Sequence, residues 1–468
     1  MNSVELVCEL RCRQGEARFD ADSLNLVRLK QDLRFESGPV EAFFSMIAFM
    51  TNPRRLNPCF VVDAHRAAAV TWFLVIQMLS AALPRCRGED LRSDARYPEP
   101  GIVYTNHRVA AVPWSIHVVR FPRTNLEFEI HSAHAGGSAL GLSTLSDQIA
   151  LLDSRLGGSV AAVNGDFYKR DGPYAGDPRG LQIVDGELVS APAGGVCFWI
   201  DALGQPQATN VLSLFQVTWP NGATSSFGLN QERPSSGVEL YTPALGPSTH
   251  TTGGRELVLE PLKDSPWLPL RIGRIYKARV REIRETGDTK IDPETMILSM
   301  GPALTGNASG ISTGSVLTIS TASSPSLRGA KTAIGGGPAL VRNGKRQKMI
   351  NPSSESYEVS SMMERHPRTA VGWNEKYIFL VEVDGRQKNL SVGMMLEELS
   401  AYLIKLGCDQ AMNLDGGGSA TLWCNGQVRN SPCDGQERPI ANSLIVVRRK
   451  TARLQRSNAA TAGSPHTP

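Results

Sequence analysis

The sequence predicts an α/β (α+β) fold, a mixed twisted sheet with flanking helices and an inserted small β-rich module. Two apolar runs, at 377–383 and 410–414, enclose a segment whose apolar residues have helical spacing, a pattern typical of a strand–helix–strand unit. Between residues 201 and 328 that spacing disappears, and short apolar runs alternate with Gly, Pro and Asn. The 44 glycines and 29 prolines indicate many turns, which suits a β-rich enzyme with long loops.

The first residues lack the pattern of a folded domain. Residues 1–65 are interpreted as a non-domain extension or as the result of a start assigned too early, with Met50 as one candidate start. Residues 66–85 contain an apolar run that is short for a membrane span but suits the core of a signal peptide. We therefore expect an exported protein, periplasmic or secreted. A genuine extension followed by a membrane anchor is the alternative.

Residues 100–200 and 329–447 are expected to form one catalytic domain, which the β-rich module at 201–328 interrupts. The short strands of that module predict a small barrel or sandwich. An insertion of this length often walls one side of a site, because loops carry specificity. Residues 448–468, first basic and then rich in Ala, Ser, Thr and Pro, predict a disordered tail.

Polar clusters follow several of the predicted strands directly. Gly158–Val163 has the pattern of a buried strand, and Asn164 and Asp166 come immediately after it. Further along, Arg368 enters another strand with a planar, permanently charged fork suited to a carboxylate or phosphate. Pro367 favours an extended backbone at His366, whose side chain is a candidate phosphate donor or a local capping group.

The strand–helix–strand unit places two acids at one sheet edge. The strand Tyr377–Val383 ends in Asp384, Ser391 is a candidate N-cap for the following helix, and the next strand ends in Asp415. The two strands of such a unit are almost always parallel, so both carboxylates are expected at the carboxyl edge, where open sheets bind ligands. Glu382 shares a face with Asp384 if the strand extends that far, although a simple strand-face charge is the plainer interpretation.

A glycine run follows the second of these acids. Asp415 is succeeded by Gly416, Gly417, Gly418 and Ser419. Glycine lets a ligand approach the main chain closely, so these residues are expected to offer N–H groups to an anion. A hairpin turn with an Asp-Gly signature is the structural alternative.

These motifs together resemble the catalytic domain of the phosphodiester glycosidases. The resemblance rests on 367–372, on Asp384-Gly385 and on 413–421, and it covers roughly 102–447. Bacterial members of the family are often labelled exopolysaccharide biosynthesis proteins. The resemblance implies a hydrolase that cleaves a sugar 1-phosphodiester, of the GlcNAc-1-phosphate type, at the anomeric bond of an envelope or exopolysaccharide glycoconjugate.

The resemblance and the chemistry together assign roles to residues. Hydrolysis at the sugar C1–O bond generally uses two carboxylates, and a phosphate leaving group reduces the need for a strong general acid. The expected catalytic residues are Asp415, Asp384, Arg368 and Asn164. Animal members carry a small residue at the position of Asp166 and Gln at that of Arg386, so these two are assigned to binding. The expected substrate and phosphate ligands are Gly416, Gly417, Gly418, Ser419, Thr369, Arg386, Asp166 and His366.

No cofactor is expected, and no zinc-type His/Cys spacing is present. The alternative is a hard cation held by Asp166, Asp384 and Asp415. A net charge of +4 and an aromatic content of 6% make nucleic-acid binding a weak interpretation. The expected partner is a sugar-phosphate or polysaccharide substrate. Contact of the protein with a membrane is expected only through the N-terminal apolar segment.

Two matters stay open at this stage. Cys424 and Cys433 flank a polar turn and form either a short disulfide or two unpaired thiols. The competing function classes are a glycosidase of ordinary glycosidic bonds and a non-catalytic carbohydrate-binding protein of exopolysaccharide assembly.

Overall fold

The computed structural model describes residues 101–137, 139–152, 157–304, 310–348 and 362–449. The predicted extension at 1–65, the apolar segment at 66–85 and nearly all of the predicted tail at 448–468 lie outside these residues. Within them, no helix is both long enough and apolar enough to cross a membrane.

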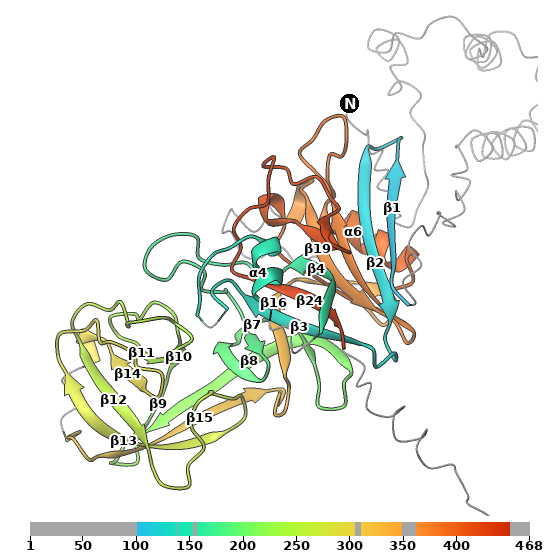
Figure 1. The fold of residues 1–468 in the computed structure, drawn as a ribbon. Coiled ribbons are helices and arrows are strands. Elements are labelled where there is room, and N and C mark those ends of the chain that lie inside the picture. Colours follow the sequence, from blue (N-terminus) through green and yellow to red (C-terminus); the bar gives the residue numbers. More distant parts are fainter. Residues whose placement is uncertain (1–100, 138, 153–156, 305–309, 349–361, 450–468) are drawn as a thin grey trace, which may run out of the picture. The chain divides into compact units, whose positions relative to one another are not determined.

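The described part of the chain is mostly β-sheet, and its strand pairs are antiparallel except for Gly228–Leu229 with Val238–Tyr241 (Figure 1). Two α-helices with full bounds occur in it, α4 (Leu145–Leu151) and α6 (Leu396–Lys405), together with the short 3-10 helix η3 (Gly417–Ser419). The predicted fold class is therefore borne out only in part: the described residues are mostly β-sheet, and the flanking helices are few. Most apolar runs here are short and form strands, and several of these, such as Arg368–Trp373 and Tyr377–Val383, are buried along nearly their whole length.

A seven-stranded sheet contains the residues predicted to form the strand–helix–strand unit. Its order is β1-β2-β20-β19-β21-β17-β18. The strands are β1 (Val103–Val109), β2 (Trp114–Pro122), β20 (Tyr377–Val383), β19 (Arg368–Trp373), β21 (Gln410–Asn413), β17 (Ala339–Arg342) and β18 (Lys345–Arg346).

Strands β20 and β21 are parallel in direction but are not neighbours. Strand β19 lies between them and pairs antiparallel with both. The connection from β20 to β21, which contains helix α6, therefore passes across β19. The N-cap of α6 is Met395, four residues later than the predicted cap Ser391. The consequence for the site is favourable, because β19 begins at the edge where β20 and β21 end.

A five-stranded sheet packs against one face of the seven-stranded sheet. Its order is β23 (Gln427–Val428), β22 (Leu422–Cys424), β4 (Gly158–Asn164), β24 (Asn442–Arg448) and β3 (Phe128–His134). Buried Val119 and Leu380 of one sheet and Val163 and Leu444 of the other belong to a single core. Helix α6 covers the opposite face of the seven-stranded sheet, with Leu399 and Leu403 packed into a second core.

The third sheet has twelve strands and contains the segment 201–328. Strands β8 and β15 run side by side in Figure 1 and connect β7 to the outer strands. The inner strands are β5 (Gln182–Val184), β6 (Glu187–Ser190), β7 (Ala193–Ile200), β16 (Thr332–Gly336) and β8 (Pro206–Thr218). The outer strands are β9 (Thr224–Ser226), β10 (Gly228–Leu229), β11 (Val238–Tyr241), β12 (Arg255–Pro261), β13 (Ile275–Arg284), β14 (Met296–Met300) and β15 (Val316–Ser324). The segment's strands thus continue a sheet that starts outside it.

Candidate functional site

Three distant segments of the chain meet at one edge of the two central sheets. The N–H of Asp415 donates to the carbonyl of Gly165 at 2.8 Å, and the N–H of Leu414 donates to the carbonyl of Thr369 at 2.8 Å. The N–H of Gly417 donates to the carbonyl of Pro367 at 2.9 Å. These bonds fix the turn after β21 against the ends of β4 and β19, as the sequence predicted for one shared edge.

A polar cavity of about 330 Å³ opens at this edge. Four of its lining residues are arginines, one is a histidine and one is a carboxylate. They are Phe167, Arg170, His366, Arg368, Arg386, Asp415, Gly416, Gly417, Gly418 and Arg438. A hollow with four guanidinium groups and a single carboxylate is a site for an anionic ligand, because arginine forks match phosphate and carboxylate oxygens.

Asp415 is the carboxylate of this cavity. Its Oδ1 accepts a hydrogen bond from the N–H of Gly416 at 2.8 Å. Burial raises the pKa of Asp415 to about 6, although the neighbouring Ser419 hydroxyl and the Gly416 N–H oppose that rise. The side chain is therefore ionised at neutral pH and becomes neutral in mild acid.

Arg368 lies at the buried back of the cavity and is firmly held. Its Nε donates to the carbonyl of Met394 and its Nη2 to the carbonyl of Glu364, both at 2.8 Å. Burial, together with the charge of Arg386, lowers the pKa of Arg368 to about 10. The guanidinium remains charged at neutral pH, and its low solvation favours an anionic partner.

His366 and Arg386 form the opposite rim. The Nη2 of Arg386 lies 3.2 Å from the Nδ1 of His366. Burial, then the charges of Arg368 and Arg386, lowers the pKa of His366. The imidazole is consequently neutral at pH 7, and both residues line the cavity.

The glycine run does not present the row of free N–H groups that the sequence predicted. The N–H of Gly416 is bound by Asp415, that of Gly417 by Pro367, and that of Ser419 by the carbonyl of Gly416 at 3.1 Å. Within these four residues, Gly418 is left as the candidate N–H donor. A Cβ at Gly418 would overlap the guanidinium of Arg438. The absence of a side chain at Gly418 therefore makes room for that arginine.

Asn164 and Thr369 support the site from behind and are both fully buried. The Oδ1 of Asn164 accepts from the Thr369 hydroxyl at 2.7 Å and from the N–H of Thr421 at 3.1 Å. Its Nδ2 donates to the carbonyl of Asp415 at 2.7 Å. Asn164, which the sequence placed among the catalytic residues, thus forms a brace between β4, β19 and the Asp415 turn.

Asp384 lies at the predicted edge, but its side chain does not line the cavity. It points between the sheets, where Oδ2 lies 2.9 Å from the Nε2 of His117 and Oδ1 accepts from the N–H of Ser431 at 2.7 Å. Its N–H continues the strand ladder to the carbonyl of Ser115. Because side chains alternate between the two faces of a strand, Asp384 points inward, between the sheets. His117 was not among the residues that the sequence predicted for the site.

Asp166 takes the place beside Asp415 that Asp384 was expected to fill. Its Oδ1 accepts from the N–H of Phe167 and its Oδ2 from the N–H of Gly180, both at 2.8 Å. Burial, with a smaller contribution from the charge of Asp415, raises the pKa of Asp166 to about 7. The residue lines a second cavity of about 380 Å³, and Phe167 is shared by both cavities.

Sequence reasoning missed Phe167, Arg170 and Arg438. Phe167 and Arg170 come shortly after Asn164 and Asp166 in the sequence. The polar cluster at the end of β4 was therefore the signal that could have drawn attention to them. Arg438 sits in a loop and is held by Asp434, with its Nη2 2.6 Å from the carboxylate. Loop residues of this kind have no periodicity to indicate which way they face.

Metal ligands converge at one place in the described residues. His117, Glu382 and Asp384 each offer a ligand atom, and these atoms lie within 4.8 Å of one another. The predicted alternative of a cation held jointly by Asp166, Asp384 and Asp415 is not formed, because Asp384 faces away from the other two.

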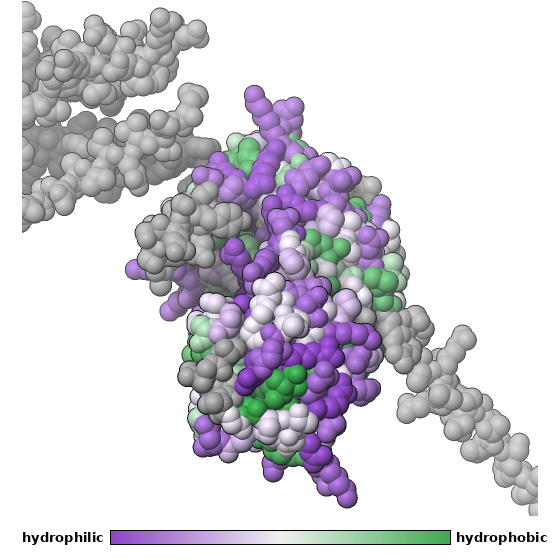
Figure 2. Space-filling view, turned by 90° about the vertical axis from the view of Figure 1, so that its left-hand side faces the viewer, coloured by the Kyte–Doolittle hydropathy of each residue, from purple (hydrophilic) through white to green (hydrophobic). Residues whose placement is uncertain are grey.

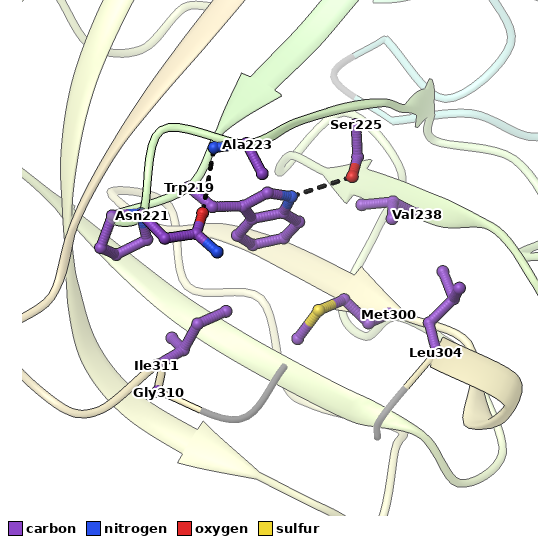
Figure 3. Close-up of a pocket in the computed structure, with 10 residues that line it drawn as sticks. Trp219, Asn221, Ala223, Ser225, Val238, Met300, Leu304, Gly310 and Ile311 are labelled. Carbon is purple, nitrogen blue, oxygen red and sulfur yellow. Dashed lines mark hydrogen bonds between the residues drawn. The ribbon is translucent and has the colours of Figure 1, made fainter. Parts of the chain in front are cut away.

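Another cavity, of about 220 Å³, lies in the twelve-stranded sheet (Figure 3). The indole of Trp219 forms one wall and donates to the Ser225 hydroxyl, while Met300 and Ile311 line the other side. Its described lining residues carry no charge, so it does not fit the predicted anionic substrate. Figure 2 also shows a hydrophobic patch on one face of the protein, with hydrophilic surface above it and to its right.

The open question about cysteines is settled for the described residues. Cys424 is buried and Cys433 is half-buried, and both are free thiols, as are Cys197 and Cys408. The disulfide alternative for the turn between Cys424 and Cys433 is therefore wrong.

The match to a protein-family model lies in the second half of the chain. Residues 275–447 match the sequence model of the phosphodiester glycosidase family. N-acetylglucosamine-1-phosphodiester alpha-N-acetylglucosaminidase is 43% identical over 68 residues in Bos taurus, or 14% of this chain and 12% of that protein. The Homo sapiens enzyme is 33% identical over 103 residues, 20% of each chain. The SPbeta prophage-derived uncharacterized protein YomE of Bacillus subtilis (strain 168) is 28% identical over 120 residues, 25% of this chain and 18% of that protein.

Two solved structures share the fold. A hypothetical protein from Synechocystis has a TM-score of 0.59 at 21% identity, over 74% of this chain and 62% of that one. A protein of Burkholderia pseudomallei K96243 has a TM-score of 0.56 at 22% identity, over 71% of this chain and 74% of that one. The matches span a fifth or less of the curated relatives' own length. In sequence, this chain is thus similar to the phosphodiester glycosidase family, over residues 275–447 in particular.

Proposed function

We propose that this protein hydrolyses a sugar 1-phosphodiester of the GlcNAc-1-phosphate type at its anomeric bond. The observation that carries the proposal is the cavity with Asp415 among the guanidinium groups of Arg170, Arg368, Arg386 and Arg438. A phosphodiester carries a permanent negative charge, and cleavage of its sugar bond increases the charge on the departing phosphate. Preplaced guanidinium groups stabilise that increase in the transition state.

Asp415 and Asp166 are the two carboxylates in position for glycosyl chemistry. Burial raises the pKa of Asp415 to about 6 and that of Asp166 to about 7, so at neutral pH Asp415 is the more fully ionised of the two. We assign to Asp415 the activation of water or the support of the positively charged sugar ring. The phosphate is already a good leaving group, so Asp166 is assigned to a sugar hydroxyl and not to an obligatory protonation.

The second cavity is the place we assign to the sugar. It adjoins the arginine cavity at Phe167 and combines apolar walls from Val196 and Leu396 with polar groups from Asp166 and Asn413. The Oδ1 of Asn413 is buried and has no hydrogen-bond partner within the described residues. A sugar ring presents hydroxyl donors along its edge and C–H groups on its faces, which matches this mixture of walls.

We extend the proposal to an envelope or exopolysaccharide glycoconjugate as the natural substrate and to export of the protein. The support for export is the apolar run at 67–83 in the sequence. A solved protein of similar fold is also named as a candidate exported protein. N-terminal sequencing of the protein isolated from its source tests this part, since a mature end far from Leu83 contradicts cleavage of a signal.

The test of function is an assay on three substrate classes. Purified protein is incubated with UDP-GlcNAc, with a GlcNAc-1-phospho-sugar and with nitrophenyl α-glycosides, and free sugar is measured. Asp415→Asn should abolish release, whereas Asp409→Asn, at the exposed other end of β21, should leave it unchanged. Carrying out the reaction in ¹⁸O-water should label the sugar and not the phosphate, because the C1–O bond is the one that breaks.

Each other outcome assigns a different function. Cleavage of nitrophenyl glycosides alone moves the protein to the ordinary glycosidases. Label in the phosphate indicates a phosphodiesterase. Absence of turnover on all three classes, with sugar binding intact, indicates a carbohydrate-binding protein.

A further inference from the structure

We propose that His117, Glu382 and Asp384 form a binding site for one divalent transition-metal ion, with Zn²⁺ as the representative ion. The site lies between the seven-stranded and five-stranded sheets. None of the three residues lines the arginine cavity, so the inference does not depend on the proposed function.

The strand register brings the three side chains together. His117 on β2 lies directly opposite Glu382 on β20. Asp384 follows two residues after Glu382 and stays on the same face, because its N–H continues the ladder to the carbonyl of Ser115. Opposite residues of an antiparallel pair project to the same side, so one imidazole and two carboxylates converge without any loop rearrangement.

Glu382 supplies the observation that points to a ligand. It is 0% exposed, and neither of its carboxylate oxygens has a hydrogen-bond partner. The Asn430 amide lies nearby and donates one N–H to the carbonyl of Ala420 at 3.1 Å, but it forms no hydrogen bond with either carboxylate oxygen of Glu382. Buried carboxylates are otherwise paired or coordinate metals, since burying one unsatisfied costs several kilocalories per mole.

The surroundings of His117 orient it as a ligand. Its Nδ1 lies 2.8 Å from the hydroxyl of Tyr104, which leaves Nε2 facing the Oδ2 of Asp384 at 2.9 Å. The Ser115 hydroxyl is 3.1 Å from the same nitrogen. A metal-binding histidine typically uses its other ring nitrogen to hold its orientation, and Tyr104 serves that purpose here. The N–H of Ser431 likewise holds the remaining oxygen of Asp384.

The donor set selects the class of ion. Two carboxylates and a neutral imidazole carry a charge of −2, which a divalent ion neutralises. A nitrogen donor disfavours Ca²⁺ and Mg²⁺, which prefer sites made of oxygen alone. Zinc accepts nitrogen and carboxylate ligands at about 2.0–2.2 Å. The three ligand atoms of His117, Glu382 and Asp384 lie within 4.8 Å of one another, so only a small movement brings all three to that distance from one ion.

The test measures binding directly and does not need a substrate. The full-length protein is unfolded in urea with a chelator, refolded with or without Zn²⁺, and dialysed. Bound zinc is then counted by mass spectrometry and affinity is measured by calorimetry. We expect one ion per chain and a rise in the unfolding temperature with zinc.

Two variants make the test specific. Glu382→Gln keeps the shape of the side chain but should weaken zinc affinity at least 10-fold and abolish the temperature rise. Glu239→Gln is the matched control, because Glu239 is also a buried strand glutamate with an unpartnered oxygen, but lies away from the site. It should bind zinc like the unmodified protein.

A spectroscopic measurement on the unmodified protein guards against a variant that fails to fold. Refolding with Co²⁺ should give visible absorbance that saturates at one ion per chain. Failure to saturate, or zinc affinity that is equal in Glu382→Gln and the unmodified protein, overturns the proposal. In that case Glu382 is buried without a metal, as the neutral acid that its raised pKa favours.

Discussion

Replacing Asn164 by alanine should destabilise the protein strongly, because this side chain joins three parts of the site. The change removes an acceptor from the Thr369 hydroxyl and from the Thr421 N–H, and a donor from the Asp415 carbonyl. The Thr369 hydroxyl can rotate to another acceptor, but the Thr421 N–H and the Asp415 carbonyl are fixed in the backbone. Each buried group left unsatisfied costs about 1–3 kcal/mol, so the expected loss is roughly 3–5 kcal/mol.

Urea denaturation followed by circular dichroism measures this loss. At about 1–2 °C per kcal/mol for a folded part of this size, the unfolding temperature should fall by roughly 6 °C. Thr369→Val removes one hydroxyl and should cost about 1 kcal/mol. Asn125→Ala is the control, since its hydrogen bonds with Glu127 are solvent-exposed and its loss should change stability by about 0.5 kcal/mol or less.

The alternative assignment gives a different result. If Asn164 positions the sugar, Asn164→Ala should raise KM while leaving the free energy of unfolding nearly unchanged. That pattern would refute the brace inferred from the three hydrogen bonds, whatever its effect on turnover.

Three further outcomes follow from the charges of the site. Arg386→Ala should raise KM for a phosphodiester about 10-fold or more, as expected for a lost charge-assisted contact, while a neutral nitrophenyl glycoside shows no such change. Activity should rise with pH through about 6, because Asp415 must lose its proton to act and its pKa is raised to that value; a pH–rate profile that is flat from 5 to 7 contradicts this role. The raised pKa of Asp166 means that the folded state holds this proton more tightly than the unfolded state, so stability is lost as pH rises from about 4 to about 7. Thermal unfolding at pH 4.5 and 7.5 should show a smaller loss in Asp166→Asn, and an unchanged loss would show that the pKa is not raised.

The sequence allowed the edge of the site to be predicted, but not which acids face the cavity. An apolar run followed by a polar residue shows where a strand ends, which located Asn164, Asp384 and Asp415 correctly. The direction of a side chain at that point depends on where the pairing stops. Strand β20 continues its ladder through the N–H of Asp384, which turns this carboxylate inward. Asp166 stays beside Asp415 because Gly180 and Gly335 leave space for its carboxylate.

The fold class was predicted only in part, for a related reason. Helical spacing between two apolar runs indicates a crossover, and the parallel direction of β20 and β21 agrees with it. Spacing along the chain cannot show that another strand occupies the gap between them. Strand β19 comes from earlier in the sequence and fills that gap, which makes every neighbouring pair in the seven-stranded sheet antiparallel.

The segment that matches the family model is too short to build the site alone. A fragment of residues 275–447 lacks β4, which lies between β22 and β24 in the five-stranded sheet, and β2, which pairs with β20. It also lacks Asn164, Phe167 and Arg170, so the Asp415 turn loses its brace and the cavity loses one wall. Two sheets with missing strands expose backbone groups and apolar faces that the intact protein buries.

We therefore expect this fragment to show no cooperative thermal transition, whereas residues 101–449 should unfold cooperatively. Circular dichroism on the fragment and on residues 101–449 measures the difference. A cooperative transition in the shorter piece would mean that the interface between the two central sheets contributes little to folding. In that event the arginines within the fragment, and not the assembled edge, would have to account for any binding of a phosphodiester.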